Sequence, residues 1–239
     1  AVHGKGLKLV LDGVFNHVGR SFPRLVDVAH NGERSAHAHW FRRVGQHPDG
    51  RPKLAVFEGH DRLVALNHAQ PDVARYVTDV MAHWLGRGAD GFRLDAAYAV
   101  PPEFWQRVLP ELRRAHPQAF ILGEVIHGDY ARTIQESGFD SLTQYELWKA
   151  IWSALNDVNM FELAWALERH AGFMEQFLPQ TFVGNHDVTR IASKLRDERH
   201  LPHAIALLLT LPGIPSIYAG DEHAFRGIKE ERAGGDGAN

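Results

Sequence analysis

The stretch Asp90-Gly91-Phe92-Arg93-Leu94-Asp95-Ala96-Ala97-Tyr98 decides the fold, because it is a short apolar strand that ends in charged residues. Side chains two positions apart on a strand share a face, so Arg93 and Asp95 are expected side by side at the carboxyl end of the strand. A cation this close favours the ionised carboxylate, which suits a nucleophile. A lone Arg-x-Asp pair is more often a structural ion pair, so its meaning depends on what the other strands carry.

Further short apolar strands are expected along the chain, and three more of them end in acidic or His-bearing turns. They are predicted at residues 7–11, 119–124, 141–143, 181–184 and 216–218, and the polar residues that follow or close them include Asp12, Asn16, His17, Glu124, Asn185, His186, Asp187, Asp221 and Glu222. Helices are predicted at residues 71–85, 102–114, 145–155, 161–170 and 203–210. Strands that alternate with helices indicate βαβ units and a parallel sheet.

The distribution of polar residues favours an α/β barrel over a doubly wound sheet. At least five of the six predicted strands carry polar groups at their carboxyl ends, where barrel enzymes place their chemistry. A doubly wound sheet would gather its ligands at one switch point instead. No Gly-rich phosphate turn follows the first strand.

The pattern breaks down between residues 19 and 66. This stretch contains several His, Gly and Pro residues and only brief apolar runs, such as residues 54–57. It is too long for an ordinary loop, so a small inserted subdomain is predicted. The predicted domains are therefore a catalytic part at residues 1–18 and 67–239 and an inserted part at residues 19–66.

Composition excludes several classes of protein. The 239 residues carry a formal net charge of -3 and no run of basic residues, so no nucleic-acid or anionic-membrane partner is expected. The chain has no Cys, which excludes disulfides and thiol chemistry. No apolar stretch reaches the roughly 18 residues that a membrane span needs, and no signal peptide is visible. The missing signal peptide says little, because the chain begins with Ala1 instead of Met. The compartment is therefore left open, with the cytoplasm slightly favoured.

Four motifs resemble, in order, the signature regions of the α-amylase family of glycoside hydrolases, family 13. They are residues 12–17 (DGVFNH), 91–95 (GFRLD), 123–125 (GEV) and 182–187 (FVGNHD), and residues 213–222 (GIPSIYAGDE) are similar to that family's eighth barrel strand. The resemblance covers nearly the whole chain. It implies a partial TIM (β/α)8 barrel that lacks the first two strands, with residues 19–66 in the place of domain B. Strands one and two and a C-terminal β-sandwich would then be missing, so a fragment of a longer enzyme is expected.

Two carboxylates carry the predicted chemistry. Retaining glycosidases hold two carboxyl groups about 5–5.5 Å apart, one as nucleophile and one as general acid/base. Asp95 and Glu124 end consecutive strands, and neighbouring strands lie about 4.8 Å apart. Asp95, beside Arg93, is expected to attack the anomeric carbon. Glu124 has no cation beside it in sequence and is expected to hold the proton for the leaving oxygen.

The resemblance implies the same two roles and assigns further residues. It makes Asp187 a third acid that stabilises the oxocarbenium-like transition state. It also implies that His17 and His186 hydrogen-bond the sugar at the cleavage point and that Asp12 holds Arg93 in place.

The resemblance gives only half of a calcium site. Asn16 matches one calcium ligand of the family, whereas Tyr98 and Ala99 stand where calcium-dependent members carry a Lys-His pair. No cofactor is therefore required, and calcium is left open as a ligand through Asn16.

The expected function is retaining hydrolysis of α-glucosidic bonds in α-glucans or malto-oligosaccharides. The forms DGVFNH and GEVIHGD are similar to neopullulanase and cyclomaltodextrinase members. A transglycosylase or isomerase would share the same glycosyl-enzyme intermediate. A non-catalytic relative would have lost one of the acids. A metal-dependent hydrolase would need His17, His186 and Asp187 within about 2–2.2 Å of one ion, and it would leave Arg93 unexplained. The oligomeric state is open.

Overall fold

The computed structural model describes residues 2–48, 51–232 and 235–236. The chain divides into two compact units, one of residues 1–124 and 136–138 and the other of residues 125–135 and 139–239. Ala1 and the last residues of the Gly-rich end at Asn239 lie outside the described part. In the described part, no helix has the length and apolar character needed to cross a membrane.

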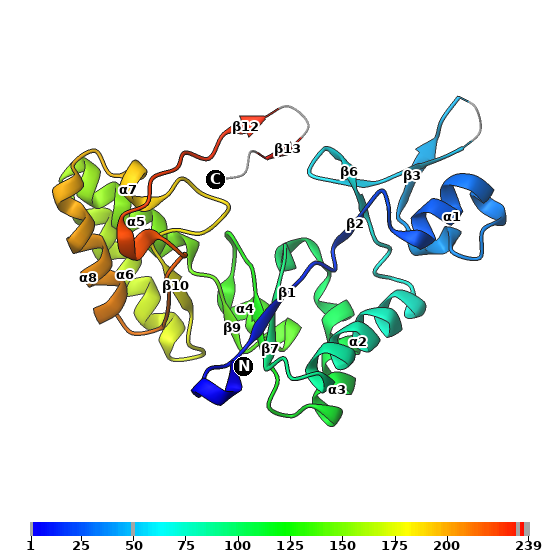
Figure 1. The fold of residues 1–239 in the computed structure, drawn as a ribbon, viewed down its shortest axis with the longest axis horizontal. Coiled ribbons are helices and arrows are strands. Elements are labelled where there is room, and N and C mark those ends of the chain that lie inside the picture. Colours follow the sequence, from blue (N-terminus) through cyan, green and yellow to red (C-terminus); the bar gives the residue numbers. More distant parts are fainter. Residues whose placement is uncertain (1, 49–50, 233–234, 237–239) are drawn as a thin grey trace. The chain divides into compact units, whose positions relative to one another are not determined.

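The first unit is built on three parallel strands in the order β1-β7-β8 (Figure 1). Their bounds are Val10–Gly13 for β1, Gly91–Leu94 for β7 and Phe120–Gly123 for β8. The sheet confirms the prediction of a parallel α/β arrangement in this part of the chain. It also requires a glycine, because a Cβ on Gly91 would lie only 2.2 Å from the backbone oxygen of Phe120 on the next strand.

Strand β1 begins later than predicted. Residues 7–11 were expected to be extended, but β1 starts at Val10 and includes Asp12. The reason is the pairing with β7, which sets Val10 opposite Gly91 and Asp12 opposite Arg93. Asp12 therefore lies within a strand and not in the turn after it.

Two helices follow the strands of this unit and pack side by side (Figure 1). Helix α2 (Pro71–Gly86) and helix α3 (Pro102–Ala115) each begin with a proline, which lacks the N–H that a first helical position leaves unpaired. Helix α2 buries Val73, Val77 and Met81 completely. Trp84 of the same helix is exposed.

The segment between β1 and α2 folds on small antiparallel sheets. Strand β6 (His60–Ala65) lies between β2 (His17–Gly19) and β5 (Val56–Phe57), and β3 (Arg43–Gln46) pairs with β4 (Pro52–Leu54). The same segment contains helix α1 (Pro23–Asn31) and the 3-10 turns Gly32–Arg34 and Ala38–Trp40. Outside this segment, the first unit has the 3-10 turns His3–Lys5 and Ala97–Ala99.

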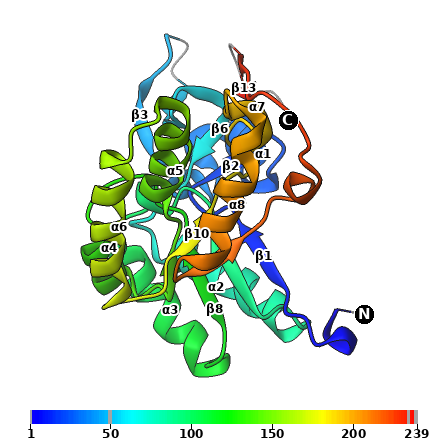
Figure 2. The ribbon, with the colours of Figure 1, turned by 90° about the vertical axis from the view of Figure 1, so that its left-hand side faces the viewer.

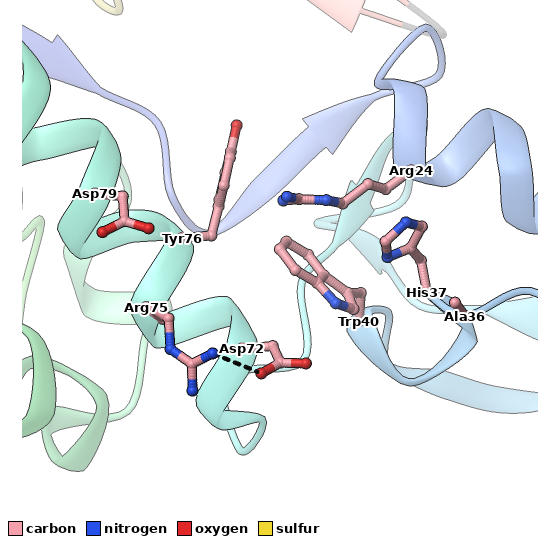
Figure 3. A pocket seen from close by; sticks show the side chains of 8 residues that line it. All are labelled: Arg24, Ala36, His37, Trp40, Asp72, Arg75, Tyr76 and Asp79. Atoms are coloured by element: carbon pink, nitrogen blue, oxygen red, sulfur yellow. Dashed lines mark ion pairs between the residues drawn. The ribbon is translucent and has the colours of Figure 1, made fainter.

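A stacked arginine joins α1 to α2. The Arg24 guanidinium lies over the rings of both Trp40 and Tyr76, 3.9 and 4.5 Å from their centroids (Figure 3). Such cation–π contacts favour the close approach of the two helices. Beside them is a pocket of about 400 Å³, whose wall includes the ion pair of Asp72 with Arg75 at 3.7 Å (Figure 3).

The second unit is mainly helical around a short parallel pair of strands, β10 (Gln180–Phe182) and β11 (Ile214–Ser216). Its helices α5, α6 and α8 pack together through a buried apolar cluster that includes Leu147, Ile151 and Leu208 (Figure 2). The remaining bounds are α4 (Tyr130–Ser137), β9 (Ser141–Leu142), α5 (Tyr145–Asp157), α6 (Phe161–Met174), α7 (Ile191–Lys194), α8 (Leu201–Thr210), the 3-10 turns Glu198–His200 and Asp221–His223, and the antiparallel pair β12 (Glu231–Arg232) and β13 (Gly235–Asp236).

Candidate active site

Arg93 on β7 is the centre of a cluster of three carboxylates in the first unit. Its Nη1 donates to Oδ1 of Asp12 and to Oδ1 of Asp95, both at 2.8 Å, and its Nη2 lies 2.6 Å from Oε1 of Glu124. The side chain of Asp12 is 52% exposed and that of Asp95 21%, whereas that of Glu124 is only 7% exposed. The three negative charges hold the pKa of Arg93 above its ordinary range, against the opposing effect of burial.

The strand register brings Asp95 and Glu124 level with each other. Leu94 pairs with Gly123, so the two acids each stand one residue beyond the last paired position of neighbouring parallel strands. The backbone N–H of each acid donates to the neighbouring strand: Asp95 N–H to Gly13 O at 3.0 Å, and Glu124 N–H to Leu94 O at 2.9 Å. Both carboxyl groups bind the same guanidinium as a result.

The backbone after Asp95 is strained and is held by Glu124. Ala96 has a φ of 44°, in the left-handed region that residues with a Cβ rarely adopt. Its N–H donates to Oε2 of Glu124 at 2.9 Å. Such strain persists only where surrounding contacts fix it, so this bond ties the turn after Asp95 to the second acid.

No cation stands next to Glu124 in the sequence, but the folded chain places the Arg93 guanidinium against its carboxyl group. Arg93 is 31 positions away in the chain but belongs to the adjacent strand, and its Nη2 contacts Glu124 directly. Oε1 of Glu124 forms an ion pair with Arg93, and Oε2 accepts the hydrogen bond from Ala96 N–H. This is the arrangement of an ionised carboxylate, the form that a general acid has after it has given up its proton.

His17 is a buried, neutral histidine near Asp95. Burial lowers the pKa of His17, and the negative charge of Asp95 opposes that shift. The Asn16 amide donates to Nδ1 of His17 at 3.2 Å, which places the proton of the neutral ring on Nε2. The ring of Phe57 stacks on it, with centroids 4.7 Å apart and an interplanar angle of 19°.

A second buried histidine gives this unit a predicted pH dependence. His68 donates through Nε2 to Phe15 O at 3.0 Å, and its pKa is lowered from 6.5 mainly by burial, as is that of His17. As the pH falls, the two histidines take up protons in the unfolded chain before they do so in the folded chain. The free energy of unfolding should therefore decrease as the pH drops below 6.5. Urea midpoints from pH 7.5 to pH 5 test this. The loss should be smaller in His68→Gln, and a midpoint that rises toward acid would contradict it.

The remaining predicted site residues lie in the second unit, in the loop after β10. Nε2 of His186 lies 3.1 Å from Oδ2 of Asp187, and Nζ of Lys229 lies 3.7 Å from Oδ1 of the same carboxylate. Asn185 accepts from Asp187 N–H at 2.9 Å and donates to the Tyr145 hydroxyl, also at 2.9 Å. Asp187 is therefore held in a network within this unit.

A buried ion pair packs against the backbone of the same loop. Nη1 of Arg190 donates to Oδ1 of Asp221 at 2.9 Å and to Ala219 O at 3.0 Å, and the guanidinium covers the Tyr218 ring at 4.1 Å. Burial raises the pKa of Asp221, and Arg190 opposes that shift. A Cβ on Gly184 would lie 2.6 Å from Oδ2 of Asp221, so the pair packs directly against the backbone before Asn185.

Removal of this arginine should be costly. Arg190→Met would leave the Asp221 carboxylate buried without its cation, and we expect a loss of about 3 kcal/mol in the free energy of unfolding. Asp221→Asn keeps an acceptor for the guanidinium and should cost less. Chemical denaturation of the two variants measures the difference. A loss for Arg190→Met no greater than that for Asp221→Asn would show that the buried charge does not matter.

Calcium at Asn16 stays an expectation from the sequence. Calcium takes about six to eight oxygen ligands, and among the residues that the structure describes no three Asp, Glu, His or Cys side chains converge as a metal site would require. The Asn16 amide nitrogen donates to the His17 ring, which leaves Oδ1, the atom that would bind calcium, out of that bond. A metal centre built from His17, His186 and Asp187 likewise stays an expectation, because His17 belongs to the first unit and the other two residues belong to the second.

Three contacts of the site were missed by sequence reasoning. Phe57 stacks on His17, the Tyr98 hydroxyl donates to Oε1 of Glu58 at 2.7 Å, and Lys229 pairs with Asp187. The Glu58-Gly59 dipeptide between two short apolar runs is a hairpin signal that could have located the first two. Lys229 lies in a polar stretch without a recognisable pattern.

The fold and the site define a parallel α/β domain with acids at the carboxyl ends of its strands. The chain belongs to the α-amylase catalytic-domain family, whose model "Alpha amylase, catalytic domain" matches residues 1–238. The parallel α/β fold agrees with the barrel structures of this family.

The relatives are longer than this chain. A cyclomaltodextrinase from Bacillus sp. is 32% identical over 237 residues, which are 94% of this chain and 42% of the relative. An intracellular maltogenic amylase from Bacillus subtilis (strain 168) is 28% identical over 233 residues, or 95% of this chain and 39% of the relative. A solved structure of the cyclic α-maltosyl-(1→6)-maltose hydrolase from Arthrobacter globiformis has a TM-score of 0.82 and 27% identity, and the match covers 95% of this chain and 53% of that one.

Proposed function

We propose that the chain forms the catalytic part of a retaining glycoside hydrolase that acts on α-glucosidic bonds of α-glucans or malto-oligosaccharides. One observation carries the proposal: Asp95 and Glu124 end adjacent, in-register parallel strands and bind the same guanidinium of Arg93. Neighbouring strands lie about 4.8 Å apart, which matches the short gap between carboxyl groups that a retaining mechanism needs.

The reaction proceeds in two displacements. Asp95 attacks the anomeric carbon and forms an ester to the sugar, while Glu124 gives its proton to the departing glycosidic oxygen. Water then attacks the anomeric carbon as Glu124 takes a proton from it, and the ester bond to Asp95 breaks. The ion pair with Arg93 and the hydrogen bond from Ala96 N–H suit the ionised form of Glu124, which is the form that the second displacement requires.

The other predicted residues are assigned supporting roles. We infer that Asp187 stabilises the oxocarbenium-like transition state and that His186 binds the sugar with it. His17, whose Nε2 carries the proton, is suited to donate to a sugar hydroxyl, and Asp12 holds Arg93. The presence of all three acids argues against a non-catalytic relative.

The substrate class, the wider architecture and the location are proposals of the same kind. The chain spans about two fifths of the length of the curated relatives it matches. We infer a partial (β/α)8 barrel, with residues 1–18 and 67–239 in the barrel and residues 19–66 as its insertion, in which strands one and two are supplied from elsewhere. The relatives' names, which refer to cyclomaltodextrin and maltose-yielding activities, support α-glucans as substrates, and one name supports an intracellular location.

A product profile with anomeric configuration tests the function. The intact protein would be incubated with starch, pullulan, cyclodextrin and trehalose, and the first-formed product would be examined by NMR. We expect α-configured maltose or short malto-oligosaccharides. First-formed β-anomers would exclude double displacement, and new linkages at high substrate concentration would indicate transglycosylation. Addition of a calcium chelator to the same assay tests whether calcium is needed.

A further inference from the structure

We propose that the β5–β6 hairpin of the inserted segment positions the two catalytic acids by holding the turn that follows Asp95. The proposal rests on the proposed function and extends it to Glu58 and Tyr98, which the family resemblance gives no role in the reaction. The hairpin joins Val56–Phe57 to His60–Ala65 and turns at Glu58 and Gly59. A side-chain hydrogen bond joins its turn to the turn that follows Asp95.

That hydrogen bond joins Glu58 to Tyr98. The Tyr98 hydroxyl donates to Oε1 of Glu58 at 2.7 Å. Tyr98 lies in the 3-10 turn Ala97–Ala99, which begins two residues after Asp95. Burial and the adjacent carboxylate of Glu58 raise the pKa of Tyr98, so the hydroxyl keeps its proton and donates at every pH at which an enzyme works. A charged acceptor makes such a bond stronger than a neutral one.

The backbone of the hairpin turn is strained in order to present Glu58. Glu58 has a φ of 47° and Gly59 a φ of 81°, the two left-handed positions of a two-residue hairpin turn. Asn, Asp and Gly are the usual residues at the first of these positions, because a longer side chain is disfavoured there. Glu at this position is therefore less favourable for stability than Asn, Asp or Gly, but its carboxylate reaches Tyr98.

The same hairpin also holds His17. Phe57 stacks on the imidazole, and β6 pairs with β2 so that Ala65 lies opposite His17. One short element thus contacts both the histidine after β1 and the turn after β7.

The contacts form a continuous path to the second acid. Glu58 holds Tyr98, the turn of Tyr98 follows the strained Ala96, and the Ala96 N–H donates to Oε2 of Glu124 at 2.9 Å. Release of Tyr98 would loosen the turn and with it the position of the Glu124 carboxyl. Glu58 and Tyr98 are therefore positioning residues, which act on the reaction through Ala96 and Glu124.

The test is a set of four single variants in the intact protein. Tyr98→Phe and Glu58→Ala each remove the hydrogen bond, Glu58→Gln keeps an acceptor, and Asp61→Asn changes an exposed residue of the same hairpin as a control. We expect Tyr98→Phe and Glu58→Ala to lower kcat on malto-oligosaccharides about tenfold with little change in KM. Glu58→Gln should retain most of the activity, Asp61→Asn all of it, and the double variant E58A/Y98F should lose no more than either single one.

The choice of substrate separates positioning from general destabilisation. An aryl α-maltoside with a strongly acidic phenol needs no proton from Glu124 in the first displacement. The variants should therefore lose far less kcat/KM, which reports that displacement, on this substrate than on malto-oligosaccharides. Equal losses on both substrates, or additive losses in the double variant, would overturn the proposal.

A measurement without turnover distinguishes this proposal from the proposed function. Amide hydrogen exchange of residues 95–99 should be faster in Tyr98→Phe and Glu58→Ala than in the parent and in Asp61→Asn. This increase is expected whether or not the protein cleaves glucans. Unchanged exchange would overturn the positioning role, whereas an inactive parent with the expected exchange would overturn only the proposed function.

Discussion

Asp95→Asn is expected to lower kcat on malto-oligosaccharides by at least about 10³-fold, because the amide cannot form the ester intermediate. The change is nearly isosteric, so Oδ1 can still accept the bond from Arg93 and the thermal unfolding midpoint should change little. Steady-state kinetics with the purified intact protein measure the effect.

Asp12→Asn is the matched control for this variant. Asp12 and Asp95 both accept from Nη1 of Arg93 at 2.8 Å, but Asp12 is 52% exposed and Asp95 21%. Asp12 is expected only to orient the arginine, so its loss should cost no more than about tenfold. Equal losses for the two variants, or residual activity of Asp95→Asn near that of the parent, would remove Asp95 from the nucleophile role.

Arg93→Met should destabilise the first unit by up to about 5 kcal/mol, since three carboxylates lose their common cation and one of them is buried. Arg93→Lys keeps the charge, but an ammonium lacks the planar fork that contacts Asp12, Asp95 and Glu124 together, so part of the loss should remain. Chemical denaturation at neutral pH measures both. The loss for Arg93→Met should shrink toward acid, where the carboxylates become neutral.

Arg75→Met provides the comparison for an exposed pair. Arg75 lies 3.7 Å from Asp72 and its side chain is 72% exposed, so its removal should cost less than about 1 kcal/mol. If Arg93→Met cost no more than Arg75→Met, the cluster at the strand ends would not be the anchor of this unit.

Local patterns predicted most of the elements but not their pairing. The helices at Pro71 and Pro102 begin where proline and the apolar spacing indicated, and the apolar strand before Asp95 is β7. The first strand was placed about three residues early, because its bounds depend on hydrogen bonds to β7, which sequence periodicity does not contain. The segment between β1 and α2 was expected to be irregular, yet it forms antiparallel pairs, since its strands are too short to show alternation.

In the candidate site, contacts within one strand could be predicted from the sequence, whereas contacts between elements could not. Asp95 and Arg93 share a strand, so their contact follows from a period of two and is found at 2.8 Å. The contact of Arg93 with Glu124 depends on strand register, and that of Glu58 with Tyr98 depends on where the hairpin packs in the fold. Local sequence can indicate the hairpin turn, but neither the register nor the contact that the turn makes. The role of Asp187 in stabilising the transition state and those of His186 and His17 in binding sugar stay predictions.

The close approach of β7 and β8 at Gly91 limits how the reaction could change. Because no side chain fits between Gly91 and Phe120 O, the spacing of the two strands, and with it the separation of the acids that follow them, is a property of the backbone. Inversion of anomeric configuration needs about 6.5–9.5 Å between carboxyl groups, enough to admit a water molecule. Remodelled surface loops cannot supply that room, whereas shortening one acid by a methylene, as in Glu124→Asp, is the simplest route to it.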